Sequence, residues 1–161
     1  MAIEIRDVIP ADRPWVRDAV AAEWGTPTVV SRGHLHAADE LPGFVALRER
    51  ATVGLLTYRV EDRQLEVVTL QAFVRRIGVG SALMAAAKQA ARRDGCTRLW
   101  LVTTNDNTPA QAFYRAVGLR LAGVHSGAVR LSRMLKPEIP VLGLNGVPIE
   151  DEMEYEVVSQ R

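Results

Sequence analysis

The chain has 161 residues, of which 48% are hydrophobic and 24% charged, and its formal net charge is +1. These values are typical of one globular domain over residues 1–161 and exclude a largely disordered chain. The small net charge disfavours a nucleic-acid binder, and no run approaches the ~18 apolar residues that a membrane helix needs. With one cysteine and no signal-peptide pattern at the N-terminus, we expect a cytoplasmic protein without internal disulfides.

The first part of the chain alternates strand-like and helix-like segments. Residues 2–8 alternate apolar and polar positions and predict a strand, and Asp12 can cap a helix that ends near Trp24. We expect a loop over residues 25–33 and a short helix around 34–39. Three consecutive strands follow, at 44–48, 52–60 and 64–70.

The second part begins with the clearest helix, over residues 80–93, which has one Ala- and Leu-rich side. A helix between strands 64–70 and 98–104 implies that these two strands are parallel within a mostly antiparallel sheet. The pattern alone therefore predicts a mixed α/β domain. The remaining elements are a helix at 109–117, a strand from Leu119 that resumes at 128–134, an irregular Pro-rich connection at 137–149 and a strand at 150–158.

The segment after strand 64–70 predicts a phosphate-binding site. It reads Arg75-Arg76-Ile77-Gly78-Val79-Gly80, and a helix starts near Ser81. The first N–H groups of a helix have no internal partner, and the helix dipole adds about half a positive charge there. Because Gly78 and Gly80 carry no Cβ, a phosphate can approach the backbone closely. The segment therefore indicates a phosphorylated cofactor, with a plain tight turn as the alternative.

Two nucleotide-binding motifs fit this segment poorly. A dinucleotide-binding turn needs a third Gly or Ala where this chain has Leu83, and an acidic residue about 20 positions further on, which is missing. A Walker loop needs a Lys directly after its last Gly, and Ser81 follows Gly80.

Two motifs resemble those of the GNAT superfamily of acetyl-CoA-dependent N-acetyltransferases. The Arg-x-x-Gly-x-Gly of residues 75–80 is similar to the pyrophosphate loop of that superfamily. A second string resembles its Asn-x-x-Ala-x-x-Phe-Tyr-x-x-x-Gly-Phe block, in the same order and at the same spacing. The motif-level resemblance covers about Leu65 to Leu119. The second string is Asn107-x-x-Ala110-x-x-Phe113-Tyr114-x-x-x-Gly118-Leu119.

The resemblance implies a fold and an activity. The fold is α/β (α+β), with a mixed, mostly antiparallel sheet, helices on both faces, and strands 64–70 and 98–104 splayed around the cofactor. The activity is transfer of an acetyl group from acetyl-CoA to a primary amine by direct attack. A non-catalytic acyl-CoA-binding sensor or regulatory module is the alternative, and a dinucleotide-binding enzyme is a second one.

The same resemblance implies a set of cofactor-binding residues. Main-chain groups on strand 64–70 and just after it are expected to pair with the pantetheine amides as an added strand does. Backbone N–H groups at the helix start hold the pyrophosphate, with Arg75 as charge partner. Asn107 either contacts the cofactor or simply caps the helix at 109–117. The expected set is Leu70, Ala72, Val74, Arg75, Arg76, Gly78, Val79, Gly80, Ser81 and Asn107.

The expected catalytic residues are Tyr114 and Glu66. Tyr114 aligns with a Tyr that acts as general acid in many GNAT enzymes, and a phenol with an ordinary pKa of about 10 holds its proton at neutral pH. Its alternative role is that of a core aromatic. Glu66 lies on strand 64–70, where strand alternation puts Val68 on its face and Val67 and Thr69 on the other. A carboxylate there is a candidate base, and an exposed strand residue is the alternative.

The remaining site predictions concern the base and the acceptor. His34, His36 and His125 titrate in the useful range and are weaker candidates for the base, and no histidine spacing indicates a metal. Regions 24–40 and 123–150 are expected to form the acceptor pocket, and Trp100 is expected in the core. The Glu side chains that alternate from Glu152 onward either favour a cationic amine or form a solvated strand face. The proposed wall residues are Trp24, Arg32, Glu150 and Glu152.

The expected partners follow from these assignments. The acceptor is a small-molecule amine or a peptide amine, with no nucleic acid and no membrane involved. The chain is expected to be a monomer or a homodimer.

Overall fold

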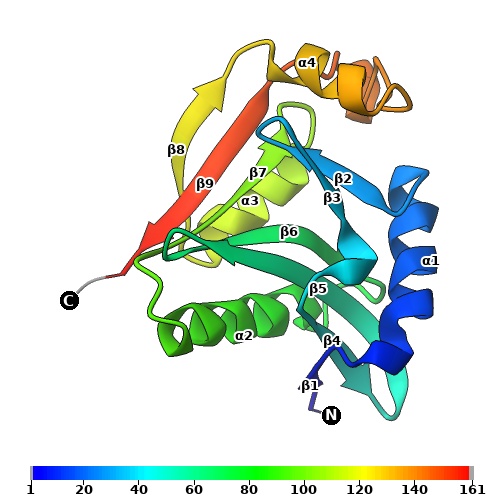
Figure 1. Ribbon diagram of the computed structural model, residues 1–161, viewed down its shortest axis with the longest axis vertical. Coiled ribbons are helices and arrows are strands. Elements are labelled where there is room, and N and C mark those ends of the chain that lie inside the picture. The colour runs from blue at the N-terminus through cyan, green and yellow to red at the C-terminus, as the bar shows by residue number, and fades with distance from the viewer. Residues whose placement is uncertain (1, 160–161) are drawn as a thin grey trace.

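The computed structural model describes residues 2–159, and within them seven strands form one mixed sheet (Figure 1). Neighbouring strands are antiparallel except β6 and β7, which are parallel as the helix between them predicted. In spatial order the strands are β1 (Glu4–Asp7), β4 (Gly43–Arg48), β5 (Ala51–Glu61), β6 (Gln64–Ala72), β7 (Arg98–Thr104), β9 (Glu152–Val158) and β8 (Arg120–His125).

Helices cover both faces of this sheet. On β5, Leu55 packs in a buried cluster with Val16 and Val20 of α1 (Arg13–Trp24). The next residue, Leu56, packs in the larger cluster that includes residues of α2 (Val79–Arg93). Because successive side chains of a strand point to opposite faces, α1 and α2 lie on opposite sides of the sheet. The predicted fold class is confirmed.

A two-stranded hairpin replaces the loop at 25–33 and the short helix at 34–39 that the sequence predicted. β2 (Thr28–Ser31) and β3 (His34–Ala37) pair with Ser31 opposite His34, and only η2 (Ala38–Glu40) is helical. Arg32 and Gly33 form the turn with φ values of 47° and 77°, the positive-φ pair of a tight hairpin. The β-branched residues before this turn favour a strand.

The predicted strand at 128–134 is also wrong. This segment is α4 (Ala128–Leu135), and Val129 and Ser132 are buried together with Lys136 just after it. The spacing of three and four residues places all three on one side of a helix. The Lys136 ammonium donates to the Thr28 carbonyl at 2.7 Å and so ties α4 to β2, and burial lowers its pKa. The following connection is irregular as predicted, apart from η3 (Leu144–Gly146).

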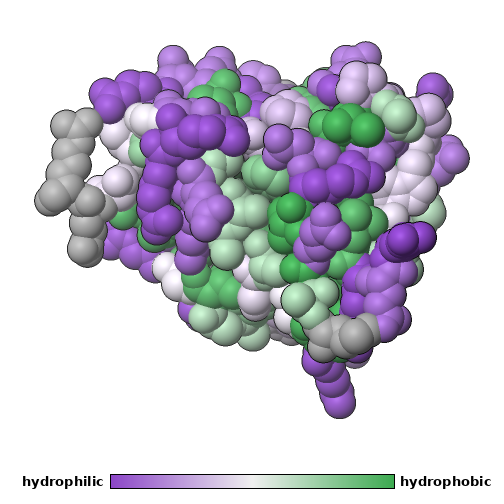
Figure 2. All heavy atoms as spheres, turned by 90° about the horizontal axis from the view of Figure 1, so that it is seen from below, coloured by the Kyte–Doolittle hydropathy of each residue, from purple (hydrophilic) through white to green (hydrophobic). Residues whose placement is uncertain are grey.

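The remaining helix, α3 (Thr108–Ala116), lies behind β7 in Figure 1. Seen from below in Figure 2, hydrophilic side chains surround a middle that holds both weakly and strongly hydrophobic residues. Over the residues that the structure describes, no helix has the length and apolar character needed to cross a membrane.

Candidate functional site

The parallel pair β6 and β7 opens after a short ladder. Within the described residues they pair at three positions, Gln64 with Arg98, Leu65 with Leu99 and Glu66 with Trp100. Beyond these pairs, β6 continues to Ala72 and β7 to Thr104, and the described residues of the two strands do not pair with each other again. The two strands therefore present facing backbone edges that a ligand carrying amide groups can pair with.

Backbone direction along β6 decides which groups face this opening. The Phe73 N–H donates to the Val53 carbonyl of β5 at 2.8 Å, so Phe73 and Gln71 bond to β5. Because backbone groups alternate along a strand, the N–H and C=O groups of Leu70 and Ala72 point into the opening. Val74 lies in the exposed segment after β6. Leu70 and Ala72 thus have the orientation that pairing with a pantetheine arm requires.

A bulge in β6 changes which side chains share a face. Thr57 of β5 pairs with Thr69 but the next residue, Tyr58, pairs with Val67, so Val68 is the extra residue. The Thr57 and Thr69 hydroxyl oxygens are 2.6 Å apart. Since Thr57 and Arg59 share one face of β5, Thr69 lies on the face of Glu66. The predicted grouping of Thr69 with Val67 is wrong because simple alternation fails across a bulge.

The start of α2 has the geometry of an anion site. Gly78 is the N-terminal cap residue with φ 86°, and no side chain of the described chain caps the helix there. The first internal bond runs from the Ala82 N–H to the Gly78 carbonyl at 3.0 Å. The N–H groups of Val79, Gly80 and Ser81 therefore precede the helical ladder and are left for a ligand. Arg75 and Arg76 are both exposed just before this turn.

The two motif segments touch at Gly80. A Cβ on Gly80 would lie 2.9 Å from Cζ of Phe113, so α3 packs directly against the first turn of α2. Tyr114 follows Phe113 on α3, and the contact therefore fixes Tyr114 relative to the free N–H groups of α2.

Tyr114 is largely buried, and its hydroxyl keeps some contact with solvent. Its ring centroid lies 5.6 Å from that of Phe113 and 5.9 Å from that of Tyr155. Among residues 2–159 the hydroxyl has no hydrogen-bond partner, and it is not a buried unpaired atom either, so solvent reaches it. Burial, and secondarily the Glu23 carboxylate, raises the pKa of Tyr114 to about 12.

Asn107 shows the capping role that the sequence left open. It is the N-cap of α3, and its Oδ1 accepts a hydrogen bond from the Ala110 N–H at 3.3 Å. A contact between its amide group and a cofactor stays a prediction.

Glu66 lies at the point where β6 and β7 separate, and its carboxylate is buried. The residue is only 2% exposed, so the alternative of an exposed strand carboxylate is wrong. Arg59 Nε donates to Oε1 at 2.7 Å and Ser31 Oγ donates to Oε2 at 2.5 Å. His36 Nε2 lies 2.8 Å from Ser31 Oγ. Burial lowers the pKa of His36, with the Glu66 carboxylate acting in the opposite direction.

Two of these partners were missed from the sequence. Ser31 is not apparent from the sequence because the pattern predicts a loop over residues 25–33. Arg59 lies directly opposite Glu66 in the β5–β6 hairpin, so counting back from the turn at Asp62 and Arg63 would have found it.

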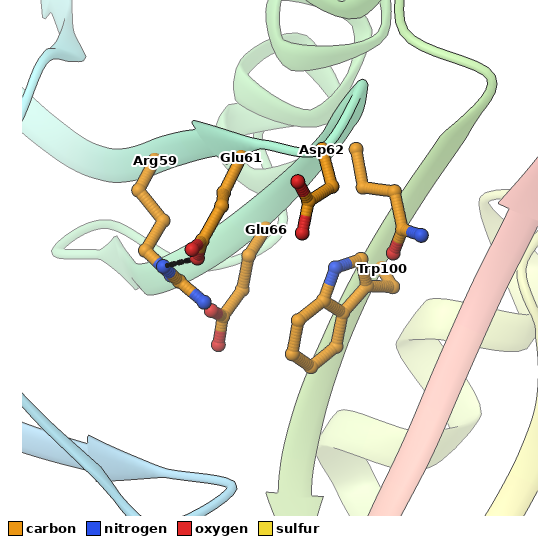
Figure 3. Close-up of a pocket in the computed structure, with 6 residues that line it drawn as sticks. Arg59, Glu61, Asp62, Glu66 and Trp100 are labelled. Carbon is orange, nitrogen blue, oxygen red and sulfur yellow. Dashed lines mark hydrogen bonds and ion pairs between the residues drawn. The ribbon is translucent and has the colours of Figure 1, made fainter.

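A small pocket of about 160 Å³ adjoins Glu66. Figure 3 shows Arg59, Glu61 and Glu66 pointing toward one another from β5 and β6, with the Trp100 indole across from them on β7. Trp100 is half-buried and lines the pocket, so its predicted place in the core is wrong. The lining residues are Arg59, Glu61, Asp62, Gln64, Glu66 and Trp100.

Two of the four predicted acceptor-wall residues meet. Arg32, in the β2–β3 turn, donates from Nη1 to Oε1 of the buried Glu152 at 3.1 Å and ties the hairpin to β9. Trp24 packs instead in the α1 cluster, and Glu150 is exposed just before β9.

The alternating Glu residues of β9 pair with basic side chains. Glu154 pairs with Arg98 and His125, and Glu156 with Arg98 and Arg120. They therefore form neither a free acidic patch nor a merely solvated row.

Residues 9–119 match the acetyltransferase (GNAT) family, and the chain therefore belongs to it. Among curated proteins, the uncharacterized protein YdhI of Bacillus subtilis (strain 168) is 37% identical over 142 residues, which cover 88% of this chain and 89% of that protein. The streptothricin acetyltransferase of Streptomyces lavendulae is 33% identical over 130 residues, which cover 73% of this chain and 64% of that enzyme.

Solved structures share the fold. A putative streptothricin acetyltransferase from Bacillus anthracis str. Ames in complex with acetyl coenzyme A superposes with a TM-score of 0.70 at 16% identity, over 99% of each chain. A Bacillus subtilis acetyltransferase in complex with CoA has a TM-score of 0.69 at 13% identity, over 98% of each chain. These neighbours hold the cofactor that the two motifs predicted.

Proposed function

We propose that this chain is an N-acetyltransferase that transfers an acetyl group from acetyl-CoA to a primary amine by direct attack. The observation that carries this proposal is the β6–β7 opening. The opening begins at the buried Glu66, and the backbone groups of Leu70 and Ala72 point into it. Family membership supports the reaction class.

The residues present fit a phosphorylated, amide-bearing cofactor. The N–H groups of Val79, Gly80 and Ser81 donate to the diphosphate, and exposed Arg75 and Arg76 add positive charge beside it. Leu70 and Ala72 pair with the pantetheine amides as a neighbouring strand does. Acetyl-CoA supplies the activated acetyl group as a thioester.

Residues of this chain then carry out two proton transfers, one to the leaving sulfur and one from the acceptor amine. Tyr114 keeps its proton throughout the neutral range, because burial raises its pKa to about 12, and its hydroxyl donates to the leaving sulfur. An N–H group of β6 at the opening polarises the thioester carbonyl. The acceptor amine must be neutral to attack. The buried side chains hydrogen-bonded around Glu66 take up the proton that the amine loses.

We further propose that the acceptor is a cationic small-molecule amine. The pocket beside Glu66 has three carboxylates, those of Glu61, Asp62 and Glu66, against the single guanidinium of Arg59. The relative from Streptomyces lavendulae is a streptothricin acetyltransferase, which makes streptothricin the first acceptor to test.

Thiol release from acetyl-CoA tests the proposal. The amines in the assay are streptothricin, spermidine, lysine amide and a peptide with a free N-terminus. We expect thiol release that depends on at least one of the small-molecule amines, with an acetylated product in the mass spectrum. Calorimetric binding of acetyl-CoA without turnover on any amine would support the sensor alternative, and absence of binding would overturn the proposal.

A further inference from the structure

A chain of hydrogen bonds links three side chains at the start of the β6–β7 opening. His36 of β3 contacts Ser31 of β2, with 2.8 Å between Nε2 and Oγ, and Ser31 contacts Glu66 of β6, with 2.5 Å between Oγ and Oε2. The direct separation between His36 Nε2 and Glu66 Oε1 is 4.0 Å. Ser31 is therefore the link between the imidazole and the carboxylate.

The Glu66 carboxylate can only accept hydrogen bonds, and this fixes the direction of each bond from His36 to Glu66. An ionised Glu66 accepts at both oxygens, so the single hydroxyl proton of Ser31 points to Glu66. Ser31 Oγ then accepts from His36, and the imidazole must carry its proton on Nε2. The other ring nitrogen, Nδ1, is left with a lone pair that can take a proton.

Solvent reaches this lone pair. Within residues 2–159, Gln71 Oε1 is the single side-chain polar atom that is both fully buried and without a partner. His36 Nδ1 has no hydrogen-bond partner in the described chain, and the residue is 8% exposed. Its Nδ1 is therefore open to water or to a small ligand.

Glu66 itself is poorly placed to act as the base. Both its oxygens are engaged, one by Arg59 and one by Ser31, and the residue is 2% exposed. With both oxygens already accepting hydrogen bonds inside the protein, neither is free to take the proton of an acceptor amine.

We propose that His36 takes the proton of the acceptor amine at Nδ1, while Glu66, acting through Ser31, is a positioning residue that stabilises the protonated ring. This inference rests on the proposed acetyltransferase function. One N–H bond of the ammonium breaks and one N–H bond forms at Nδ1. The positive charge passes from the amine to the imidazole and leaves to solvent after acetyl transfer.

The groups around His36 shift its pKa in both directions. Glu66 of β6 favours the protonated ring, whereas Arg59 of β5 and His34 of the same strand oppose it. Burial is the largest effect and lowers the pKa of His36, so the ring is neutral and ready to accept a proton at pH 7. Once the ring is protonated, its positive charge is stabilised through Ser31 by the buried Glu66 carboxylate.

Nitrogen NMR tests the tautomer without any acceptor. The chain has three histidines, so single His→Gln variants assign every ring. We expect His36 to carry its proton on Nε2 at pH 7.5, and Ser31→Ala to remove that preference. A His36 ring protonated on Nδ1 would overturn the inference, because the proposed accepting atom would be occupied.

Kinetics of His36→Gln, with streptothricin and spermidine as probe amines, test the role in turnover. We expect kcat at pH 7 to fall about 100-fold, the usual range for loss of a general base, with KM for acetyl-CoA within about threefold of wild type. In His36→Gln the acid limb of the pH profile of kcat should also shift, because the ring that titrates is lost. Ser31→Ala should lower kcat less, by about tenfold, because His36 remains.

The control is Gln89→Ala on α2, whose side chain is exposed. It should retain wild-type kcat. If His36→Gln keeps wild-type kcat while Glu66→Gln loses it, the inference fails and Glu66 is the base. Calorimetry separates this outcome from failure of the proposed function. If the proposed function failed, wild-type protein would bind no acetyl-CoA.

Discussion

At the scale of single residues, the environment of Tyr114 assigns it one protonation state. Burial and the nearby Glu23 carboxylate both disfavour the phenolate and raise the pKa to about 12. Tyr114 can therefore donate a proton but cannot serve as a base at any pH where the protein is assayed. This separates its role from that of the group that deprotonates the acceptor.

Replacing Tyr114 by Phe should lower kcat by at least about tenfold, because the ring packing stays while the proton donor is lost. Calorimetric affinity for acetyl-CoA should change by less than about threefold. Since the wild-type phenol stays protonated, the ratio of the two rates should be constant between pH 6 and 9. Near-wild-type turnover of the variant would remove Tyr114 from the mechanism.

The pKa of His36 also predicts how stability depends on pH. An unfolded chain protonates histidine near pH 6.5, whereas burial lowers the pKa in the folded protein. Below about pH 6.5 the unfolded state therefore binds more protons, and folding stability falls as the pH is lowered. Above that pH this contribution is constant.

Thermal unfolding at pH 7.5 and 5.5 measures this effect. Wild type should lose more Tm between these conditions than His36→Gln, which has no ring to protonate. Gln89→Ala, an exposed change without a titrating group, should keep the wild-type loss. Equal losses in wild type and His36→Gln would show that another group carries the acid sensitivity.

The sequence located Glu66 and Tyr114 but not the partners of Glu66. Tyr114 stands in a motif with fixed spacing, so its helix and neighbours followed from the chain itself. Ser31 and His36 reach Glu66 only through tertiary packing of a hairpin 35 and 30 positions earlier in the chain. Simple alternation also misplaced Thr69, because the bulge at Val68 leaves no unambiguous sign in the sequence.

At the scale of elements, the contact between α2 and α3 couples the two motifs. Gly80 has no Cβ where the Phe113 ring lies against α2, and a Cβ there would lie 2.9 Å from Cζ. The glycine of the first motif is thus required by the aromatic residue of the second, in addition to any phosphate. This explains in physical terms why the motifs belong together.

Replacing Gly80 by Ala should destabilise the protein by about 1 kcal/mol. Overpacking costs about 1–3 kcal/mol, and the better helix propensity of Ala offsets part of that cost. Adding Phe113→Leu should recover stability relative to the sum of the two single changes. Urea unfolding measures these differences, with the exposed Gln89→Ala on the same helix as the control. A Gly80→Ala protein more stable than wild type would contradict the packing argument.

The elements that were mispredicted share one physical feature. Both β2–β3 and α4 are short, and each is held by contacts with distant segments in addition to its own propensity. Lys136 bonds to Thr28 and Arg32 bonds to Glu152, across more than one hundred residues in both cases. The longer elements, such as α2 and β5, carry enough internal periodicity to be predicted directly.

At the scale of the whole molecule, the sheet is interrupted between β6 and β7. A parallel ladder of three residue pairs holds the two halves together. Beyond Glu66 and Trp100, the edges of β6 and β7 that face each other have no strand partner among residues 2–159. A ligand that pairs with both edges completes the sheet. Binding should therefore stabilise the fold as a whole, beyond the loop before α2.

Acetyl-CoA should accordingly raise the thermal stability of the whole chain. At a concentration of 100 times Kd, a ligand that binds only the folded state adds about 2.7 kcal/mol, which corresponds to a Tm increase of about 5–10 °C at this size. A nicotinamide dinucleotide at equal concentration should leave Tm unchanged, because the sheet has no doubly wound parallel arrangement. Arg75→Ala with Arg76→Ala should reduce the acetyl-CoA shift, most clearly at low salt where exposed charges are least screened. An equal shift with both nucleotides would show that binding uses the phosphates alone and leaves the β6–β7 opening unfilled.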